Sequence, residues 1–169
     1  MSAQALAKPE SRVTVFLSYT KVDRPVAERL HQFIHQDGVD CFFAPETLEA
    51  GEYWDPKLVA EVETRAVFLV LFTAAASHSN WVQKEIAMAQ DACREIWVIQ
   101  DPDVDLDYLE RRDLVREHNF YLQKDSEQKC FEQIARRINR RWPSRDHVYS
   151  GEIIKDNCPY PDVYKRQVV

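Results

Sequence analysis

The stretch Ala66-Val67-Phe68-Leu69-Val70-Leu71-Phe72-Thr73 is the most apolar run in the chain. It has the length of a β-strand, and its apolar residues do not alternate with polar ones. A strand without alternation is covered on both faces, which is typical of a parallel sheet that lies between two layers of helices. We therefore predict that residues 66–73 form the central strand of an α/β domain.

Other segments on both sides of this run have the composition of strands or the spacing of amphipathic helices. β-Branched and aromatic residues predict further strands at 12–19, 39–44 and 95–100, and a weaker one at 119–123. Apolar residues at helical spacing predict helices that begin at Asp23, at about Tyr53, after Ser79 and at Asp125, where Asp125 and Gln128 resemble a capping box. Residues 74–79 and 101–107 are interpreted as connections.

Strands that alternate with helices predict one fold class, α/β, with a flavodoxin-like five-stranded parallel sheet and helices on both faces. In such sheets, ligands bind outside the carboxyl ends of the strands. The loops that follow Tyr19, Ala44, Thr73 and Gln100 are therefore expected at the binding edge. The start of the helix after Ser79 is expected at the same edge.

The length and composition indicate a single domain. The chain has 169 residues, of which 45% are hydrophobic and 30% charged, enough for one compact core. We predict that the domain spans residues 12–142, with tails at 1–11 and 143–169 outside the core. The net charge of -6 argues against general affinity for nucleic acid or anionic membrane. Without an apolar run of roughly 18 residues or a signal peptide, a cytoplasmic location is expected.

Several kinds of site are excluded by the counts of particular residues. The four cysteines include no Cys-x-x-Cys pair, so neither a zinc site nor a disulfide framework is expected, and Cys41 and Cys93 are interpreted as small buried residues. The three glycines, Gly38, Gly51 and Gly151, cannot form a Gly-x-Gly-x-x-Gly phosphate loop. None of the five histidines belongs to a recognisable Ser, His and acid grouping.

A pair of residues in the helix after Ser79 is the strongest candidate site. Trp81 and Glu85 are four positions apart, so they share one helix face, with Trp81 as a wall of the pocket into which Glu85 points. The core-facing residues are predicted to be Val82, Ile86 and Ala89. A helical Glu is usually a solvated residue and a helical Trp usually packs, so the position at the sheet edge is what favours a site.

At this point the sequence resembles TIR domains. The matching features are Phe16-Leu17-Ser18-Tyr19 at the end of the first strand, Asp23 at the first helix, the loop Leu48-Glu49-Ala50-Gly51, and Ser79-Asn80-Trp81-Val82-Gln83-Lys84-Glu85-Ile86, in family order and spacing. Within the family the chain looks most like the NAD-cleaving branch, which includes bacterial defence TIR proteins and the animal axon-degeneration TIR enzyme. In that branch the catalytic Glu lies in a Trp-x-x-x-Glu pattern, which Trp81 and Glu85 fit.

The resemblance implies an enzyme of immune or defence signalling that cleaves the nicotinamide N-glycosidic bond of NAD. The products would be nicotinamide and either ADP-ribose or a cyclic isomer. Glu85 would be the catalytic carboxylate. By resemblance, the residues that line the substrate site are Trp81, Tyr19, Thr20, Glu49, Gly51, Tyr53 and Ser79. NAD would be the substrate, with no separate cofactor and no metal.

The chemistry is compatible with a site of one carboxylate. Nicotinamide leaves a cationic pyridinium as a neutral molecule, so its departure needs no general acid. Glu85 would stabilise the positive charge that develops on the ribose, as carboxylates do in glycosidases. Because the chain offers no glycine loop and no basic cluster for the remainder of NAD, we expect a second protomer to complete the site through TIR–TIR contacts.

Three other protein classes share some of these sequence features with an NAD-cleaving enzyme. A non-catalytic TIR module would act only by assembly with other TIR domains, through the loop 46–53. A nucleoside deoxyribosyltransferase-like protein also uses a Glu against an N-glycosidic bond, but the loop 48–51 favours a TIR domain. A phospho-receiver domain is excluded, because it needs acidic residues where this chain has Tyr19 and Thr73.

Overall fold

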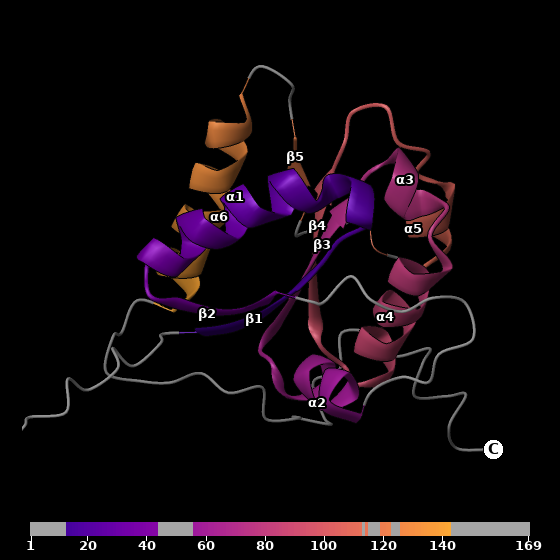
Figure 1. Ribbon diagram of the computed structural model, residues 1–169, viewed down its shortest axis with the longest axis horizontal. Coiled ribbons are helices and arrows are strands. Elements are labelled where there is room, and N and C mark those ends of the chain that lie inside the picture. Colours follow the sequence, from indigo (N-terminus) through magenta and orange to yellow (C-terminus); the bar gives the residue numbers. More distant parts are fainter. Residues whose placement is uncertain (1–12, 44–55, 113, 115–118, 123–125, 143–169) are drawn as a thin grey trace, which may run out of the picture.

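The computed structural model describes residues 13–43, 56–112, 114, 119–122 and 126–142 of the chain (Figure 1). The elements in chain order are β1 (Val13–Ser18), η1 (Lys21–Asp23), α1 (Arg24–Gln36), β2 (Val39–Phe43), α2 (Pro56–Thr64), β3 (Val67–Phe72), α3 (Ala74–Ser77), α4 (Asn80–Asp91), β4 (Glu95–Gln100), α5 (Asp107–Arg111), β5 (Asn119–Tyr121) and α6 (Glu127–Arg141). The strand order is β2-β1-β3-β4-β5, and every pairing is parallel. The predicted five-stranded parallel sheet is confirmed.

The central position of β3 explains its composition. All six of its residues are buried, because β1 and β4 pair with its two edges and helices cover both of its faces (Figure 1). The register places Val70 of β3 beside Ser18 of β1 and beside Val98 of β4. The last residue of β1 is therefore held against the middle of the sheet.

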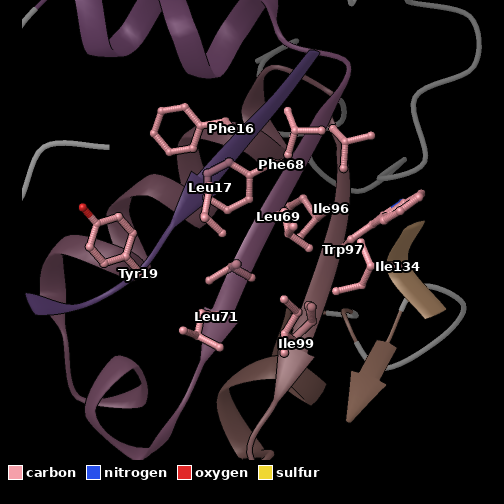
Figure 2. Close-up of a cluster of buried hydrophobic side chains, with 14 of the residues drawn as sticks. Phe16, Leu17, Tyr19, Phe68, Leu69, Leu71, Ile96, Trp97, Ile99 and Ile134 are labelled. Carbon is pink, nitrogen blue, oxygen red and sulfur yellow. The ribbon is translucent and has the colours of Figure 1, made fainter. Parts of the chain in front are cut away.

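Two layers of helices enclose the sheet. Helices α1 and α6 lie on one face, and α2 and α4 lie on the other (Figure 1). Figure 2 shows the rings of Phe16 and Phe68 side by side, and their centroids are 5.3 Å apart. On the α6 side, Trp97 packs on Trp142, which follows α6, with ring centroids 6.0 Å apart. Both faces of the sheet therefore contribute to the core.

Two short helices, α3 and α5, are absent from the predicted elements: α3 lies within the predicted connection 74–79, and α5 begins at the last residue of the predicted connection 101–107. α3 forms after β3 because the side chain of Thr73 accepts a hydrogen bond from the backbone N–H of Ala76 at 3.2 Å. α5 follows the acidic stretch and places Leu109 in the core with no exposed surface. Both were missed because four or five residues are too few for a helical period to be recognised.

Two predicted helix caps are corrected by the structure. α6 begins at Glu127 with Ser126 as its N-cap residue and without a side-chain cap hydrogen bond, so the predicted start at Asp125 is wrong, and Asp125 itself lies outside the described residues. Asp23 is the N-cap residue of α1, but its side chain makes no cap hydrogen bond. Its carboxyl group accepts from hydroxyls of two neighbouring loops instead.

Cysteine usage also differs from the prediction. Cys41 is buried and free, as is Cys130. Cys93 is half-buried and disulfide-bonded, so its interpretation as a small buried residue is wrong, and the disulfide also contradicts the expectation drawn from the cysteine spacing. Cys93 adopts a φ of 54° in the turn between α4 and β4.

Candidate functional site

Helix α4 carries the candidate catalytic residue. Ser79 caps the helix, since its hydroxyl accepts a hydrogen bond from the backbone N–H of Val82 at 3.3 Å. Val82, Ile86 and Ala89 are fully buried, as predicted, and they fix this helix on the sheet. Glu85 lies on the same helix and is also fully buried, with 0% of its surface exposed. A carboxyl group in such a position needs hydrogen-bond partners.

The partner of Glu85 comes from a distant part of the chain. The hydroxyl of Ser18, the last residue of β1, donates to Glu85 Oε2. A side-chain hydrogen bond joins Trp81 to the same carboxyl group. Trp81 is half-buried and packs against the core. The predicted proximity of Trp81 and Glu85 is therefore present in the structure, with Ser18 as a third member.

The electrostatics of Glu85 are dominated by burial. Burial raises the pKa of the Glu85 carboxyl to about 8, while hydrogen bonds from Ser18 and Trp81 act in the opposite direction and lower it. Glu85 Oε1 has no hydrogen-bond partner among the residues that the structure describes. At neutral pH the carboxyl group is thus largely protonated, and one of its oxygens is available to a ligand.

The other predicted site residues on the first strand and its loop lie at the carboxyl edge. Tyr19 follows β1 directly and is buried, and its ring stacks on Phe43 at the end of β2 with centroids 4.6 Å apart. Figure 2 shows Tyr19 beyond the end of the β1 strand. Thr20 is half-buried and donates to Asp23 Oδ2 at 2.6 Å. Their contact with a substrate stays a prediction.

A small cluster of hydroxyls around Asp23 joins two of the loops at this edge. Asp23 Oδ2 accepts from Thr20 Oγ1 and from Thr73 Oγ1, each at 2.6 Å. Thr73 follows the central strand, so the loop after β1 is tied to the loop after β3. Asp23 therefore organises the edge on which Glu85 is placed.

Three predicted residues cannot be placed. Glu49, Gly51 and Tyr53 lie outside the described residues, and their role in substrate binding stays a prediction. Ser79 has a structural role as the α4 cap, and its predicted contact with substrate is likewise open. Within the described part of the chain, no group of three His, Cys, Asp or Glu side chains is arranged to hold a metal ion.

A cleft of about 490 Å³ lies elsewhere, between the beginning of α4 and α5. Its lining includes Gln83, Tyr108 and Arg112, but none of Ser18, Trp81 and Glu85. Two of its polar side chains already have partners: Tyr108 donates to the Gln83 carbonyl at 3.3 Å, and Arg112 donates to Gln90 Oε1 at 3.2 Å. We therefore assign the candidate site to the buried carboxyl group rather than to this cleft.

Ser18 and Thr73 are the polar residues that sequence reasoning did not assign to the site. Ser18 was part of the Phe16-Leu17-Ser18-Tyr19 match, yet no role was given to it. The sequence feature that could have indicated a role for Ser18 is its place as a polar residue at the end of an apolar strand, two positions after Phe16. Alternate residues of a strand share a face, which places Ser18 on the side that faces α4.

The parallel sheet with helices on both faces is of the doubly wound α/β class, and a buried carboxyl group lies at the carboxyl edge of its strands. A model of the TIR domain family matches residues 15–135, which is most of the chain. The chain therefore belongs to the TIR domain family. No protein of curated function matches it. None of the described helices has the length and apolarity needed to cross a membrane.

Solved structures with this fold have low sequence identity to the chain. The RPS4 and RRS1 TIR domain heterodimer matches with a TM-score of 0.60 and 13% identity, over 78% of this chain and 99% of that one. A metazoan TIR-STING receptor from C. gigas, in complex with 2',3'-cGAMP, matches with a TM-score of 0.55 and 20% identity, over 79% of this chain and 42% of the receptor chain. The Clostridium botulinum CMP N-glycosidase BcmB matches with a TM-score of 0.50 and 16% identity, over 72% and 97% respectively.

Proposed function

We propose that this TIR domain is an NAD nucleosidase that cleaves the bond between nicotinamide and ribose. The observation that carries the proposal is the Glu85 carboxyl group, which is fully buried and has one oxygen, Oε1, without a partner among the described residues. A buried polar atom without a partner destabilises the fold. Such an atom is expected where a ligand supplies the missing interaction.

The charge of the substrate suits this environment. The pyridinium ring of NAD carries a positive charge, and an opposite charge nearby favours the ionised form of a carboxyl group. Binding of NAD would therefore lower the pKa of Glu85 from about 8 and release its proton. The resulting carboxylate would stabilise the cation that develops on the ribose as nicotinamide leaves. Trp81, half-buried beside Glu85, would form a stacking wall for a ring.

A second candidate function is the hydrolysis of a nucleotide N-glycosidic bond whose base is neutral. Its support is the structural similarity to the CMP N-glycosidase BcmB together with the raised pKa of Glu85. A neutral pyrimidine is a poor leaving group unless it is protonated, and a carboxyl group that remains protonated near neutral pH can serve as the acid.

The pH dependence separates these two functions. Cleavage of NAD needs ionised Glu85, so its rate should fall as the pH is lowered through the pKa of that carboxyl group. Cleavage of CMP with Glu85 as the acid should fall as the pH is raised through it. Both substrates are to be tested with the same preparation.

We also propose that the domain acts in immune or defence signalling in the cytoplasm and that it self-associates. The RPS4 and RRS1 structure is a heterodimer of TIR domains. The chain has no Gly-rich phosphate loop, so contacts from a second protomer would complete the site for a ligand as long as NAD. A head-to-tail contact of that kind propagates into filaments unless it closes into a ring. A non-catalytic assembly module is the alternative.

The decisive experiment incubates the purified protein with NAD and identifies the products by mass spectrometry. Release of nicotinamide by the wild-type protein but not by Glu85→Gln supports the proposal, and equal turnover by both proteins contradicts it. The same products distinguish linear ADP-ribose, a cyclic isomer and base exchange. If NAD is untouched at every protein concentration while light scattering detects assembly, the adaptor function is favoured.

The need for a second protomer has its own test. Specific activity is measured against protein concentration, with light scattering on the same samples. A shared site predicts that activity per protomer falls as assemblies dissociate. Gly51→Pro, which fixes φ in the predicted binding loop, should lower activity although Glu85 is unchanged. Constant activity per protomer down to purely monomeric protein would exclude a shared site.

A further inference from the structure

The hydrogen bond between Ser18 and Glu85 joins two fully buried side chains that are far apart in the sequence. Both residues are fully buried, and they come from separate elements, β1 and α4, with 67 positions between them in the sequence. A hydroxyl at the end of a buried strand can usually bond to a backbone carbonyl nearby. Here the Ser18 hydroxyl is directed to one oxygen of the only carboxyl group that the described part of the chain buries fully.

The bond makes the two oxygens of Glu85 different. Oε2 accepts from Ser18, whereas Oε1 has no partner among the described residues. Hydrogen bonds from Ser18 and Trp81 restrict the rotation of this buried carboxyl group, and they therefore also restrict the direction of Oε1. We propose that Ser18 is a positioning residue for Glu85, which holds Oε2 so that Oε1 faces the substrate; this inference rests on the proposed function.

The same bond favours the ionised form of Glu85. A hydrogen bond donated to a carboxylate stabilises the ionised form, so Ser18 lowers the pKa of Glu85 against the opposing effect of burial. Without it, Glu85 would be protonated over a wider range of pH and fewer molecules would be active. Ser18 thus acts on both the direction and the charge of the reacting carboxyl group.

The charged side chains around α4 do not supply this effect in place of Ser18. β1, β3 and α3 contain no ionisable residue, and on α4 itself Lys84 and Asp91 are exposed. On α2, Lys57 and Glu63 are exposed and Glu61 pairs with Arg65, while Glu95 of β4 pairs with Arg141. On α5, Glu110 is exposed, Asp107 pairs with Arg111, and Tyr108 donates to the Gln83 carbonyl. The hydroxyl of Ser18 and the indole of Trp81 are the hydrogen-bond donors that lower the pKa of Glu85.

The test is the pH profile of kcat/KM for NAD cleavage by the wild type, Ser18→Ala and Ser18→Thr. Ser18→Ala should move the acid limb to higher pH by about one unit, which is about a tenfold loss at a fixed pH below the limb. Ser18→Thr keeps the hydroxyl and should restore most of the limb position. Thr14→Ala is the matched control, because Thr14 lies earlier on β1 and its hydroxyl accepts from the Ala66 N–H at 3.0 Å. It should leave the limb unchanged.

A second measurement separates this inference from the proposed function. The Glu side chains are labelled with 13C at the carboxyl carbon, and the Glu85 signal is identified by its loss in Glu85→Gln. Its titration midpoint should be higher in Ser18→Ala than in the wild type, whether or not NAD is cleaved. A shifted midpoint without any turnover would contradict the proposed function alone.

Other results would overturn the positioning role. An unchanged midpoint in Ser18→Ala, or a loss of activity that is equal at every pH, would reduce Ser18 to a packing residue. If Ser18→Ala does not fold, the titration midpoint of Glu85 is measured in Ser18→Cys instead, because a thiol has nearly the same shape as a hydroxyl but is a weak donor. Its midpoint should also rise, and a wild-type midpoint would contradict the inference.

Discussion

Two carboxyl groups at the same edge of the sheet are used differently. Asp23 is half-buried, and its Oδ2 accepts hydrogen bonds from Thr20 and Thr73. Glu85 is fully buried and receives hydrogen bonds from Ser18 and Trp81, yet its Oε1 has no partner among the described residues. The fully buried carboxyl group is thus the one that keeps a buried oxygen without a protein partner.

This difference separates a structural carboxyl group from a candidate catalytic one. The bonds to Asp23 join the loops after β1 and β3, and they contribute to the stability of the binding edge. Glu85 lacks part of the stabilisation that a buried polar group normally obtains. A buried polar atom without a partner lowers the stability of the fold and is retained where function needs it. Substitution of Glu85 should therefore mainly lower activity, whereas removal of the Asp23 carboxyl group should mainly lower the free energy of unfolding.

The largest expected effect is on activity, when the charge of Glu85 is removed and the shape of its side chain is kept. The same kind of change at Asp23 is the control. Glu85→Gln should lower the rate of NAD cleavage on the order of 10² to 10³ or more, because a preorganised charge at a developing cation is lost. Asp23→Asn keeps an acceptor oxygen and should retain activity within a few-fold. Rates of nicotinamide release for the two variants check this. Similar losses in both variants would remove the distinction between the two carboxyl groups.

A second effect is the dependence of stability on pH. The folded-state pKa of Glu85 is raised to about 8 from the ordinary value of 4.5, so the folded protein binds the proton more tightly than the unfolded chain does. Its contribution is favourable below pH 4.5 and is lost as the pH rises toward 8 and beyond. The free energy of unfolding should fall on the order of a few kcal/mol across this window.

The matching variant removes that dependence. Glu85→Gln does not titrate, so its stability should change less than that of the wild type between pH 5 and pH 8. Urea denaturation at the two pH values measures both proteins. Identical pH dependence in the wild type and the variant would mean that Glu85 titrates in the folded state as it does in the unfolded chain.

The next effect is the loss of the acceptor that joins the two loops. Asp23→Ala leaves the hydroxyls of Thr20 and Thr73 without the acceptor that they share, and the free energy of unfolding should fall by about 1–3 kcal/mol. Chemical denaturation provides the value. Thr20→Val, which removes one of the two donors, should cost less, and a larger cost for Thr20→Val than for Asp23→Ala would contradict the network.

A smaller effect on catalysis is expected at the aromatic wall. Trp81→Ala should raise KM or change the ratio of cyclic to linear product by about 2- to 10-fold, since an aromatic contact contributes about 0.5–1.5 kcal/mol. It should not abolish turnover, because the charge on Glu85 remains. Product analysis by mass spectrometry at several NAD concentrations gives both quantities. Complete inactivity in a folded variant would assign Trp81 a larger role.

The smallest effect is expected at the separate cleft beside α5. Arg111 and Asp107 form an ion pair at 2.7 Å, with both side chains largely exposed, and exposed pairs contribute about 0–1 kcal/mol. Asp107→Asn should therefore change neither NAD cleavage nor the thermal midpoint appreciably. A marked loss of activity would mean that this cleft, rather than the carboxyl group of Glu85, takes part in binding.

The sequence predicted the sheet well because each strand carries its own signal. The continuous apolar run 66–73 predicts a strand covered on both faces, and it contains the central strand β3. The start of α4 was also predictable, since Ser79 precedes an amphipathic pattern and is its cap. Local patterns fail for α3 and α5, whose few residues are fixed by Thr73 and Leu109.

The site was predictable only in part. The spacing of Trp81 and Glu85 placed them on one helix face, but spacing does not reveal that Glu85 is fully buried. The hydroxyl of Ser18 meets Glu85 only because β1 and α4 both pack at the centre of the sheet, and no pattern within either segment encodes that contact. The use of the Asp23 carboxyl by Thr20 and Thr73, rather than by the start of α1, is likewise a tertiary effect.

The separation of Ser18 and Glu85 along the chain has a consequence for folding kinetics. The bond between them closes a loop of 67 positions, and the entropy of closing such a loop must be offset before the contact can form. In the folded protein β1 pairs with β3, and we expect this pairing to precede the contact between β1 and α4. During refolding, the recovery of enzyme activity should therefore lag behind the recovery of helical circular dichroism and coincide with the formation of the parallel sheet.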